Sequence, residues 1–551
     1  MRIPLPSIIL AITITSAIGG CVSSRYSKEL SDELTTEIKT LQEEAPVIEG
    51  EVIHNPDVIT QLYEKGGSLL SAKWNNVDKI TQMMYAIRSA SEEGLRPEDY
   101  HLSDIEKLTD RIISSDEVRT EDIASLELLL TDAFLVLSSH LAAGKTDPET
   151  IDPQWKVVRR TIRQNWDSFI DSTLMSGYIF ETMHSLSPAH ADYYNLKKAL
   201  ATYRRLEEEG GWESFNTSLP KLEKGMRNPD IALLRKRIAV TEGFFASDTI
   251  DADYFDQTLH DRVKLFQQKN SLTVDGIVGK STIEALNIPV EERIATIIAN
   301  LERWRWINDN LGERYIKVNI ANFGLQVMEG DTQVFSSLAI VGKLYRETPV
   351  FSSVMRYLVL NPVWTVPETI LKEDIIPAMI KNPEYLAEKK MKVFSTNGTE
   401  VDPLTIDWNN ALTKGFPYVV KQEPGPFNSL GKVKFMFPNQ YDVYIHDSPS
   451  RSLFLQNIRA FSSGCIRILK PLELAQLLLK DDPAWSPEKV REAMNTGLEQ
   501  SIVLPKSIPV HILYLTAWAT DEGTVFFGKD IYNRDRKLID ALNEIPPGPG
   551  Q

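Results

Sequence analysis

Cysteine and histidine are scarce in this chain. Its 551 residues include only two cysteines, Cys21 and Cys465, and eight histidines that form no HExxH pair. No second cysteine lies near Cys465, so the ligand spacing of a typical metal site is missing. We therefore expect neither a metal nor a cofactor.

An excess of positive charge is also missing. The formal net charge is −16, and no dense cluster of lysine and arginine occurs. Because phosphate binding needs a basic surface, this charge argues against nucleic acid as a partner. The composition, 42% hydrophobic and 25% charged, is typical of a soluble globular protein, and the length suggests three or four domains.

The N-terminal segment lacks an apolar run long enough to cross a membrane. The run from Ile8 to Ile18 is well short of the roughly 20 residues that a span requires. It is followed by two glycines and Cys21, an arrangement that resembles a bacterial lipoprotein signal. The resemblance implies that residues 1–21 are a signal peptide, that Cys21 is lipidated, and that the protein is periplasmic. Because Val22 rather than aspartate follows, it implies an outer-membrane anchor. An ordinary secretory signal or an uncleaved anchor are the alternatives.

Lipidation of Cys21 would leave Cys465 unpaired in an oxidising compartment. A lone thiol there is open to oxidation and to stray disulfides. Cys465 is therefore either deeply buried and inert, or its thiol is needed.

The first half of the sequence is helical in pattern. Residues 22–51 are polar and predict a tether between membrane and protein, with room for a short helix. Residues 52–230 carry apolar residues at helical spacing and predict an all-α scaffold domain.

Residues 231–290 predict a pair of helices around a glycine-containing turn. The sequence VKLFQQKNSLTVDGIVGKSTIEALN resembles the three-helix peptidoglycan-binding module. A generic helical hairpin is the alternative. The resemblance implies a peptidoglycan partner, with Asp275, Gly276 and Gly279 of the turn as candidate binding residues. A linker helix is expected over 291–312.

From residue 313 the apolar period changes from helical to two, which predicts a mostly β domain over 313–540. The strand pattern is interrupted over about 367–431. So long an excursion is more often a lid or a binding element than idle chain, and we interpret it as a capping insertion. A tail, 541–551, completes a multidomain α + β fold.

The stretch from Tyr441 to Leu479 combines residue types needed for acyl transfer. His446 follows a short β-type run, and Cys465 stands nineteen positions later, within Ser-Ser-Gly-Cys-Ile-Arg. A thiol becomes a good nucleophile beside a base or a cation, and both His446 and Arg467 are available. Backbone N–H groups around Gly464 could form an oxyanion hole. Spacing alone is weak evidence, because a cysteine and a histidine this close are common.

Taken together, His446-Asp447 and Ser462-Ser463-Gly464-Cys465-Ile466-Arg467 resemble the signature of the L,D-transpeptidase catalytic domain, although many members carry glycine after the histidine. The whole arrangement resembles the large periplasmic L,D-transpeptidases. The resemblance implies that Cys465 is the nucleophile and His446 the proton acceptor.

By the same resemblance, Arg467 and Gly464 assist catalysis, and Tyr444 and Ser463 line the site. Trp364 is a candidate substrate contact. The alternatives are that Tyr444 is an ordinary strand aromatic, Ser463 a turn residue and Arg467 half of a surface ion pair.

The family resemblance implies 3→3 cross-linking of peptidoglycan stem peptides through a thioester, with loss of D-alanine from a tetrapeptide donor. It also implies acylation by carbapenems and a role in cell-wall organisation and cell shape, with other wall synthases or hydrolases as potential partners. An L,D-carboxypeptidase, an endopeptidase or a protein–peptidoglycan ligase would use the same thioester. A wall-binding lipoprotein with a decayed catalytic domain is a further alternative, but none of the expected catalytic residues has been lost.

Overall fold

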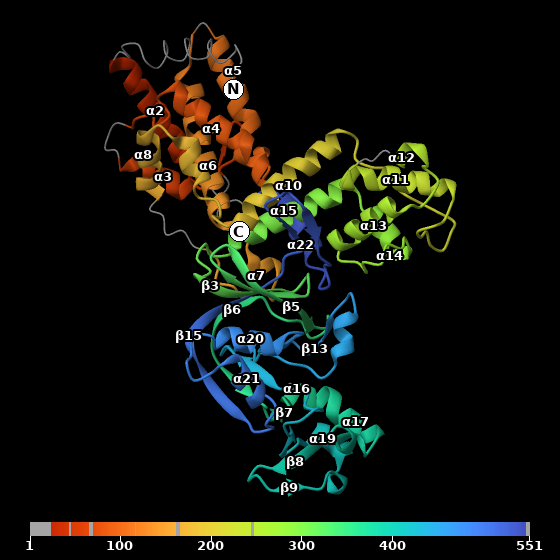
Figure 1. The fold of residues 1–551 in the computed structure, drawn as a ribbon. Coiled ribbons are helices and arrows are strands. Elements are labelled where there is room, and N and C mark those ends of the chain that lie inside the picture. The colour runs from red at the N-terminus through yellow and green to blue at the C-terminus, as the bar shows by residue number, and fades with distance from the viewer. Residues whose placement is uncertain are drawn as a thin grey trace.

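The described residues form four hydrophobic cores, with the helical N-terminal domain at one end of the molecule and a small capping element at the other (Figure 1). The computed structural model describes residues 24–42, 46–65, 70–115, 117–160, 166–243 and 247–546. The predicted signal peptide and Cys21 lie outside the described residues. The expected class is confirmed: helical domains precede a β domain that carries an insertion.

The N-terminal domain packs its helices around the leucine-rich helix α6 (Thr120–Ala143). α6 has the length and composition of a membrane span, but 89% of its most apolar window is buried inside the protein, which is typical of a core helix. Around it lie a short hairpin and further helices: β1 (Val47–Ile48), β2 (Glu51–Val52), α3 (Pro56–Glu64), α4 (Val77–Ser89), α5 (Leu102–Ser114), α8 (Trp166–Ser176) and α9 (Ile179–His184).

The prediction of a polar tether over 22–51 is wrong for most of that segment. Residues Ser24–Thr40 form helix α2, which packs against α6. Leu34, Ile38 and Leu41 recur at helical spacing and are buried in the scaffold core. Charged residues stand between these apolar residues in the sequence, which makes the stripe hard to see. Because the stripe is buried against α6, the segment is part of the scaffold domain.

Helix α15 (Val290–Trp306) is a central element and not a linker, so the predicted boundary at 291–312 is wrong. It packs against α10 (Ala191–Glu208), and its side chains join the core of the β domain. Asn300 exchanges two 2.8 Å hydrogen bonds with Thr516. The predicted tail is also shorter than expected, because α22 (Asp535–Asn543) crosses residue 541 and buries Leu542 in the same core.

The peptidoglycan-binding-like module has its own core and begins before residue 231, since Phe215 and Leu222 belong to that core. Its helices are α11 (Pro229–Glu242), α12 (Ser247–Ile250), α13 (Gln257–Lys269) and α14 (Lys280–Leu286). The predicted turn before α14 needs glycine at 276, where φ is +74° and a Cβ would clash with the His260 ring.

The β domain is a nine-stranded sheet in the order β13-β5-β14-β12-β11-β6-β15-β3-β4, and β4 also pairs with β5, which closes the sheet on itself. The strands are β3 (Arg314–Asn319), β4 (Gly324–Glu329), β5 (Thr332–Gly342), β6 (Phe351–Leu360), β11 (Val433–Met436), β12 (Ile445–His446), β13 (Ala460–Ser462), β14 (Ile466–Ile468) and β15 (Gln500–Leu513). Peripheral elements are α7 (Pro148–Ile151), α20 (Pro471–Leu478), α21 (Pro487–Ala493), β16 (Ala517–Ala519) and β17 (Val525–Phe527).

The excursion predicted at 367–431 is a folded cap with a core of its own, drawn from Trp364 to Leu430. Its sheet has the order β7-β10-β8-β9. Its elements are β7 (Trp364–Thr365), α16 (Glu368–Ile370), the π-helical turn η3 (Leu371–Ile375), α17 (Ile376–Lys381), α18 (Tyr385–Glu388), β8 (Met391–Ser395), β9 (Glu400–Val401), α19 (Trp408–Lys414) and β10 (Tyr418–Gln422).

Candidate active site

Strands β12 and β14 bring the predicted catalytic residues together. They pair in parallel, with His446 opposite Arg467, and the Ile466 N–H donates to the Tyr444 carbonyl at 3.0 Å. Adjacent strands lie about 4.8 Å apart, and alternate residues share one face of a sheet. Tyr444, His446, Cys465 and Arg467 therefore gather on one face, although about twenty residues separate the two pairs in sequence.

His446 is buried and held in one tautomer. Its Nδ1 lies 2.6 Å from the Asp447 carbonyl oxygen, so Nδ1 carries the proton and Nε2 is the acceptor. Burial, followed by the nearby Arg467 charge, lowers the pKa of His446 to about 3. The imidazole is thus neutral at physiological pH and able to accept a proton. The backbone carbonyls of Asp447 and Leu430, rather than a third acidic side chain, face the ring.

The Cys465 thiol is partly accessible and protonated at neutral pH. Its Sγ points to the Asp442 carbonyl oxygen at 3.6 Å. Burial raises the pKa of Cys465 to about 11, against the opposing effects of Tyr444 and Arg467. Among the described residues no hydrogen bond joins this thiol to His446, so the two groups are not yet aligned for direct proton transfer. Catalytic hydrogen bonds are often incomplete without substrate.

Arg467 supplies positive charge to the site and is not half of a surface ion pair. It forms no ion pair within the described part of the chain, and its buried Nε has no hydrogen-bond partner. Its charge lowers the pKa of both His446 and Cys465. Burial in turn lowers the pKa of Arg467 itself. The arrangement favours a thiolate once a base removes the proton.

The turn before the nucleophile is fixed by a buried hydrogen-bond chain that the sequence analysis missed. Gly464 has φ +111°, a conformation that favours glycine. Its carbonyl oxygen accepts a 2.8 Å bond from Thr348 Oγ1, which accepts from the Gly342 N–H at 2.9 Å. The Tyr532 hydroxyl donates to the Gly342 carbonyl at 2.8 Å. In the sequence this position is marked only by the pair Thr348-Pro349, and the burial of Thr348 is seen only in the structure.

The predicted oxyanion hole has one free donor in this turn. The Gly464 N–H is already used, since it donates to Ser462 Oγ at 3.2 Å. Across the described chain, no acceptor is found for the Cys465 N–H. The Cys465 amide is therefore available to a substrate oxygen, whereas the Gly464 amide is not.

Asp447, which stands where many family members carry glycine, organises the loop after His446. Its carboxylate accepts bonds from the backbone N–H groups of Lys432 and Ser448, at 2.9 and 2.7 Å, and from Arg451 at 2.7 Å. A side chain at Gly431 would clash with it. Asp447 is thus a turn residue, and among the described residues its carboxylate makes no hydrogen bond to Nδ1 of His446.

The cap reaches the site through three of the predicted residues. The Tyr444 hydroxyl interacts with the Cys465 sulfur and with the Trp364 side chain, and burial raises its pKa. Tyr444 also packs against the core of the cap. Ser463 Oγ accepts a 2.8 Å bond from Arg346, which also binds Glu373 and Asp374 of the cap.

Three family models match parts of the chain. Residues 313–490 match the model described as "L,D-transpeptidase catalytic domain". Residues 227–286 match a "Putative peptidoglycan binding domain", and residues 58–200 match a "Scaffold domain". Residues 313–490 are an L,D-transpeptidase catalytic domain.

Known proteins from several bacteria are similar to parts of this chain. A Haemophilus influenzae protein described as "Putative L,D-transpeptidase" is 35% identical over 273 residues, which cover 49% of this chain and 55% of that protein. The chain thus spans about half the length of this relative. A solved L,D-transpeptidase from Mycobacterium smegmatis is 13% identical, with a TM-score of 0.17. The match covers 36% of this chain and 58% of the solved chain. A solved L,D-transpeptidase from Xylanimonas cellulosilytica is 12% identical, with a TM-score of 0.18. The match covers 54% of this chain and 100% of the solved chain. Scores this low carry no argument about the fold.

The candidate residues of the peptidoglycan-binding module hold its turn together. The Asp275 carboxylate accepts 2.9 Å bonds from Gln267 and from the Ile277 N–H, and the Gly276 N–H donates to Gln267. Gly279 caps the start of α14. None of them contacts the L,D-transpeptidase site, and a role in binding stays a prediction.

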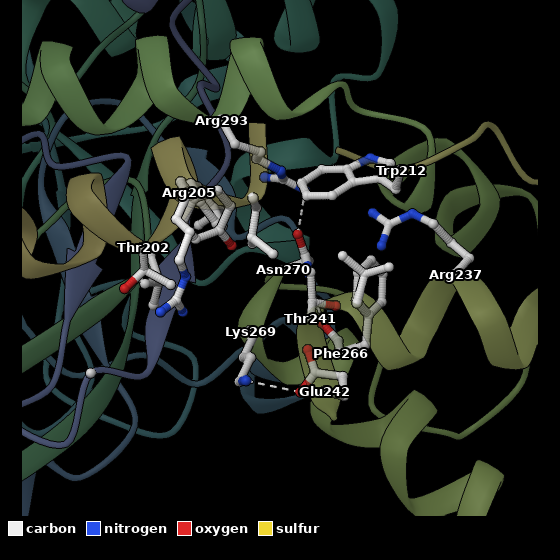
Figure 2. Close-up of a pocket in the computed structure, with 16 residues that line it drawn as sticks. Thr202, Arg205, Trp212, Arg237, Thr241, Glu242, Phe266, Lys269, Asn270 and Arg293 are labelled. Carbon is white, nitrogen blue, oxygen red and sulfur yellow. Dashed lines mark hydrogen bonds and ion pairs between the residues drawn. The ribbon is translucent and has the colours of Figure 1, made fainter. Parts of the chain in front are cut away.

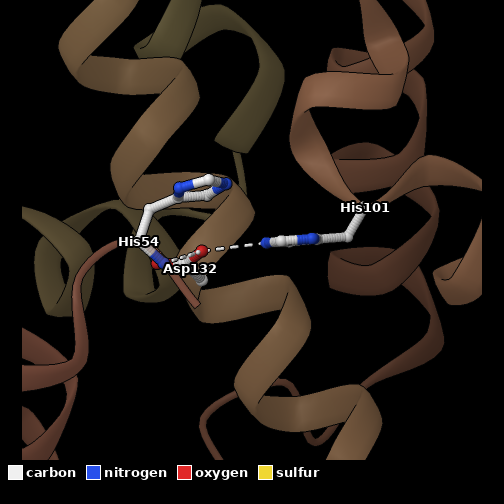
Figure 3. A group of neighbouring side chains, drawn as sticks. All are labelled: His54, His101 and Asp132. Atoms are coloured by element: carbon white, nitrogen blue, oxygen red, sulfur yellow. Dashed lines mark hydrogen bonds and ion pairs between the residues drawn. The ribbon is translucent and has the colours of Figure 1, made fainter. Parts of the chain in front are cut away.

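A second cluster of titratable side chains lies in the scaffold domain (Figure 3). His101 is buried, with Nε2 2.8 Å from Asp132 and Nδ1 3.2 Å from Glu51. The ligand atoms of His54, His101 and Asp132 lie within 4.8 Å of one another, close enough for one metal ion. However, both nitrogens of His101 face carboxylates, and these bonds raise its pKa to about 9 despite burial. We interpret the cluster as a buried imidazolium–carboxylate pair that fastens the β1–β2 hairpin to α6.

Proposed function

We propose that this protein is a peptidoglycan L,D-transpeptidase that forms 3→3 cross-links through a thioester on Cys465. The observation that carries the proposal is the gathering of Tyr444, His446, Cys465 and Arg467 on one face of β12 and β14. The module that resembles a peptidoglycan-binding domain supports the same polymer as substrate.

In the first half-reaction His446 Nε2 takes the thiol proton and Cys465 Sγ attacks the carbonyl carbon of the diaminopimelate residue, at its L-centre. The Cys465 N–H donates to the developing oxyanion, and Arg467 offsets its charge. The bond to D-alanine then breaks, and the departing amine takes the proton from His446. A thioester remains on Cys465.

In the second half-reaction the side-chain amine of a second stem peptide's diaminopimelate attacks the thioester. The C–S bond breaks as the new amide forms, and the amine proton returns by way of His446 to the sulfur. Water as acceptor would make the protein an L,D-carboxypeptidase, and an existing cross-link as donor would make it an endopeptidase. A lysine of another protein would make it a ligase. The cap, placed beside Tyr444 and Ser463, is the element best placed to shape an acceptor groove.

The test is to incubate the protein without its signal peptide with a disaccharide-tetrapeptide and to follow the masses of protein and products. The wild type is expected to gain an acyl adduct lacking D-alanine and then to release a cross-linked dimer, whereas Cys465→Ala forms neither. Tripeptide without dimer would favour the carboxypeptidase. No adduct on folded wild type would contradict the thioester and favour a non-catalytic wall-binding protein. A carbapenem adduct on Cys465 is expected as well.

The proposed location is the periplasm, with a lipid on Cys21 anchoring the protein to the outer membrane. The support is the sequence of the N-terminal segment. The first described helix begins at Ser24, so the anchor would lie next to the folded scaffold. Labelling of cells with an alkyne fatty acid, followed by membrane fractionation, is expected to place lipid on the wild type and none on Cys21→Ala.

A further inference from the structure

A positively charged pocket lies between the peptidoglycan-binding-like module and the catalytic domain (Figure 2). It has a volume of about 170 Å³ and is bounded by α10, α11, α13, α15 and β17. Its charged lining consists of one carboxylate, Glu242, and four cations: Arg205, Arg237, Lys269 and Arg293. This local excess stands against the net charge of −16 for the whole chain.

Arg237 is buried with an unused donor. The residue is 5% exposed, its Nε donates to the Leu286 carbonyl at 2.8 Å, and its Nη1 has no hydrogen-bond partner. The guanidinium lies 4.2 Å from the centre of the Trp212 ring. An aromatic face offsets part of the charge, but a buried N–H without an acceptor remains costly.

Arg293 lies on the other side of the pocket and is also without a carboxylate partner among the described residues. It is 8% exposed, and it donates to the Asn270 side chain and, at 3.3 Å, to the Ala285 carbonyl. Its guanidinium is 4.2 Å from the centre of the Phe527 ring. Burial lowers the pKa of each arginine to about 10, and for Arg237 the charge of Arg293 adds to the effect.

The carboxylate of the pocket favours the charged form of Arg237, but its effect on the pKa is smaller than the opposing effect of Arg293. Glu242 is paired with Lys269 at 2.8 Å. Two guanidiniums that repel each other in a buried setting therefore face the same space, with aromatic rings beside them. An anion between them would accept from the unused N–H and remove the repulsion.

We propose that this pocket binds a carboxylate of a peptidoglycan stem peptide, with the adjoining part of the ligand against Trp212, Phe266 and Phe527. The proposal rests on the proposed function, because it takes peptidoglycan as the polymer. Carboxylates are its abundant anions, and guanidinium binds them through paired N–H donors. Because β17 belongs to the core of the catalytic domain, such a ligand would bridge the module and the catalytic domain.

The experiment uses the full mature chain carrying Cys465→Ala, so that no turnover occurs. Binding of a disaccharide-tripeptide is measured by calorimetry for this protein, for Arg237→Gln, and for Arg227→Gln as a matched control. Arg227 is an exposed arginine of the same module, paired with Asp251 and Asp253. We expect Arg237→Gln to weaken binding about tenfold or more, as for loss of a charge-assisted bond, and Arg227→Gln to leave it unchanged.

Two further arms separate the possible outcomes. In the first arm, a tripeptide with amidated carboxylates should bind the parent protein as weakly as the unmodified tripeptide binds Arg237→Gln. In the second arm, thermal melting verifies that each variant is folded. If Arg237→Gln does not fold, Arg237→Lys, which keeps the charge but loses the paired donors, takes its place.

Equal binding by the arginine variant and its control would overturn the proposal. The proposal would also be overturned if inorganic phosphate stabilised the protein and the tripeptide did not displace it. That result would indicate a site for small anions. Acyl-enzyme formation by protein with Cys465 intact is measured separately, so a failure here leaves the thioester chemistry standing.

Discussion

The Thr348 hydroxyl donates a 2.8 Å hydrogen bond to the carbonyl oxygen of Gly464, the residue before the nucleophile. In a planar trans peptide the C=O and the following N–H point in opposite directions. Holding the Gly464 carbonyl against Thr348 therefore aims the Cys465 N–H away from the protein core. Thr348 is thus a positioning residue for the proposed oxyanion donor.

Replacing Thr348 with valine should remove that hydrogen bond at nearly constant volume. We expect kcat for acylation to fall about tenfold or more, with little change in KM, because a misaligned oxyanion donor weakens only the transition state. Thr348→Ser should restore most of the rate. Burst kinetics with a tetrapeptide donor give both constants. A proportional loss in Thr348→Ser, or a change confined to KM, would contradict the positioning role.

The pH dependence of thiol alkylation tests the resting state of the site. With the pKa of Cys465 raised to about 11 and that of His446 lowered to about 3, both groups are neutral between these values. The alkylation rate with iodoacetamide should therefore rise about tenfold per pH unit from pH 7 toward 10, as the thiolate fraction grows. Cys465→Ala corrects for other sites. A rate already at its plateau near pH 7 would indicate a preformed thiolate–imidazolium pair.

Arg346 ties the cap to the active-site turn. It binds Glu373 at 2.6 Å, Asp374 at 2.5 Å and Ser463 at 2.8 Å. Arg346→Gln should loosen the cap and lower kcat/KM by roughly fivefold to twentyfold, because three charge-assisted contacts of a largely buried guanidinium are lost, two of them to half-exposed carboxylates. Lys392→Gln, which removes an exposed ion pair within the cap, serves as the control. The same loss of kcat/KM in both variants would show that the contacts of Arg346 have no specific role in catalysis.

His101 should make the stability of the scaffold domain depend on pH. Its folded pKa of about 9 lies above the ordinary value of 6.5, so the stabilisation is fully present below about pH 6.5 and is lost as pH rises through 9. The shift corresponds to a contribution on the order of 3 kcal/mol at low pH. The deficit of His101→Gln in free energy of unfolding should shrink from pH 6 to 10. A zinc-dependent rise in the Tm of the wild type would instead favour a metal site.

Strong local patterns allowed most of the fold to be predicted. The alternation predicted after residue 313 corresponds to hairpins β3–β4 and β4–β5, whose turns lie near Asn322 and Asp331. The glycine turn of the binding-like module is where its sequence indicates. By contrast, α2 and α15 were misjudged as tether and linker. Their apolar residues are interspersed with charge, and only the partners they pack against show that they are core.

The sequence by itself determined the chemical inventory: one thiol suited to catalysis, one nearby histidine, an arginine two residues on, and a motif of the L,D-transpeptidase domain. Only the tertiary structure decided how these groups are used. Three of these arrangements join residues far apart in sequence: the parallel pairing of β12 with β14, the bond from Thr348 to Gly464, and the two arginines that face one pocket. The fourth, the hydrogen bond of His446 to the Asp447 carbonyl, depends on the local direction of the backbone. Burial and hydrogen-bond direction set charge states, and neither can be read from residue order.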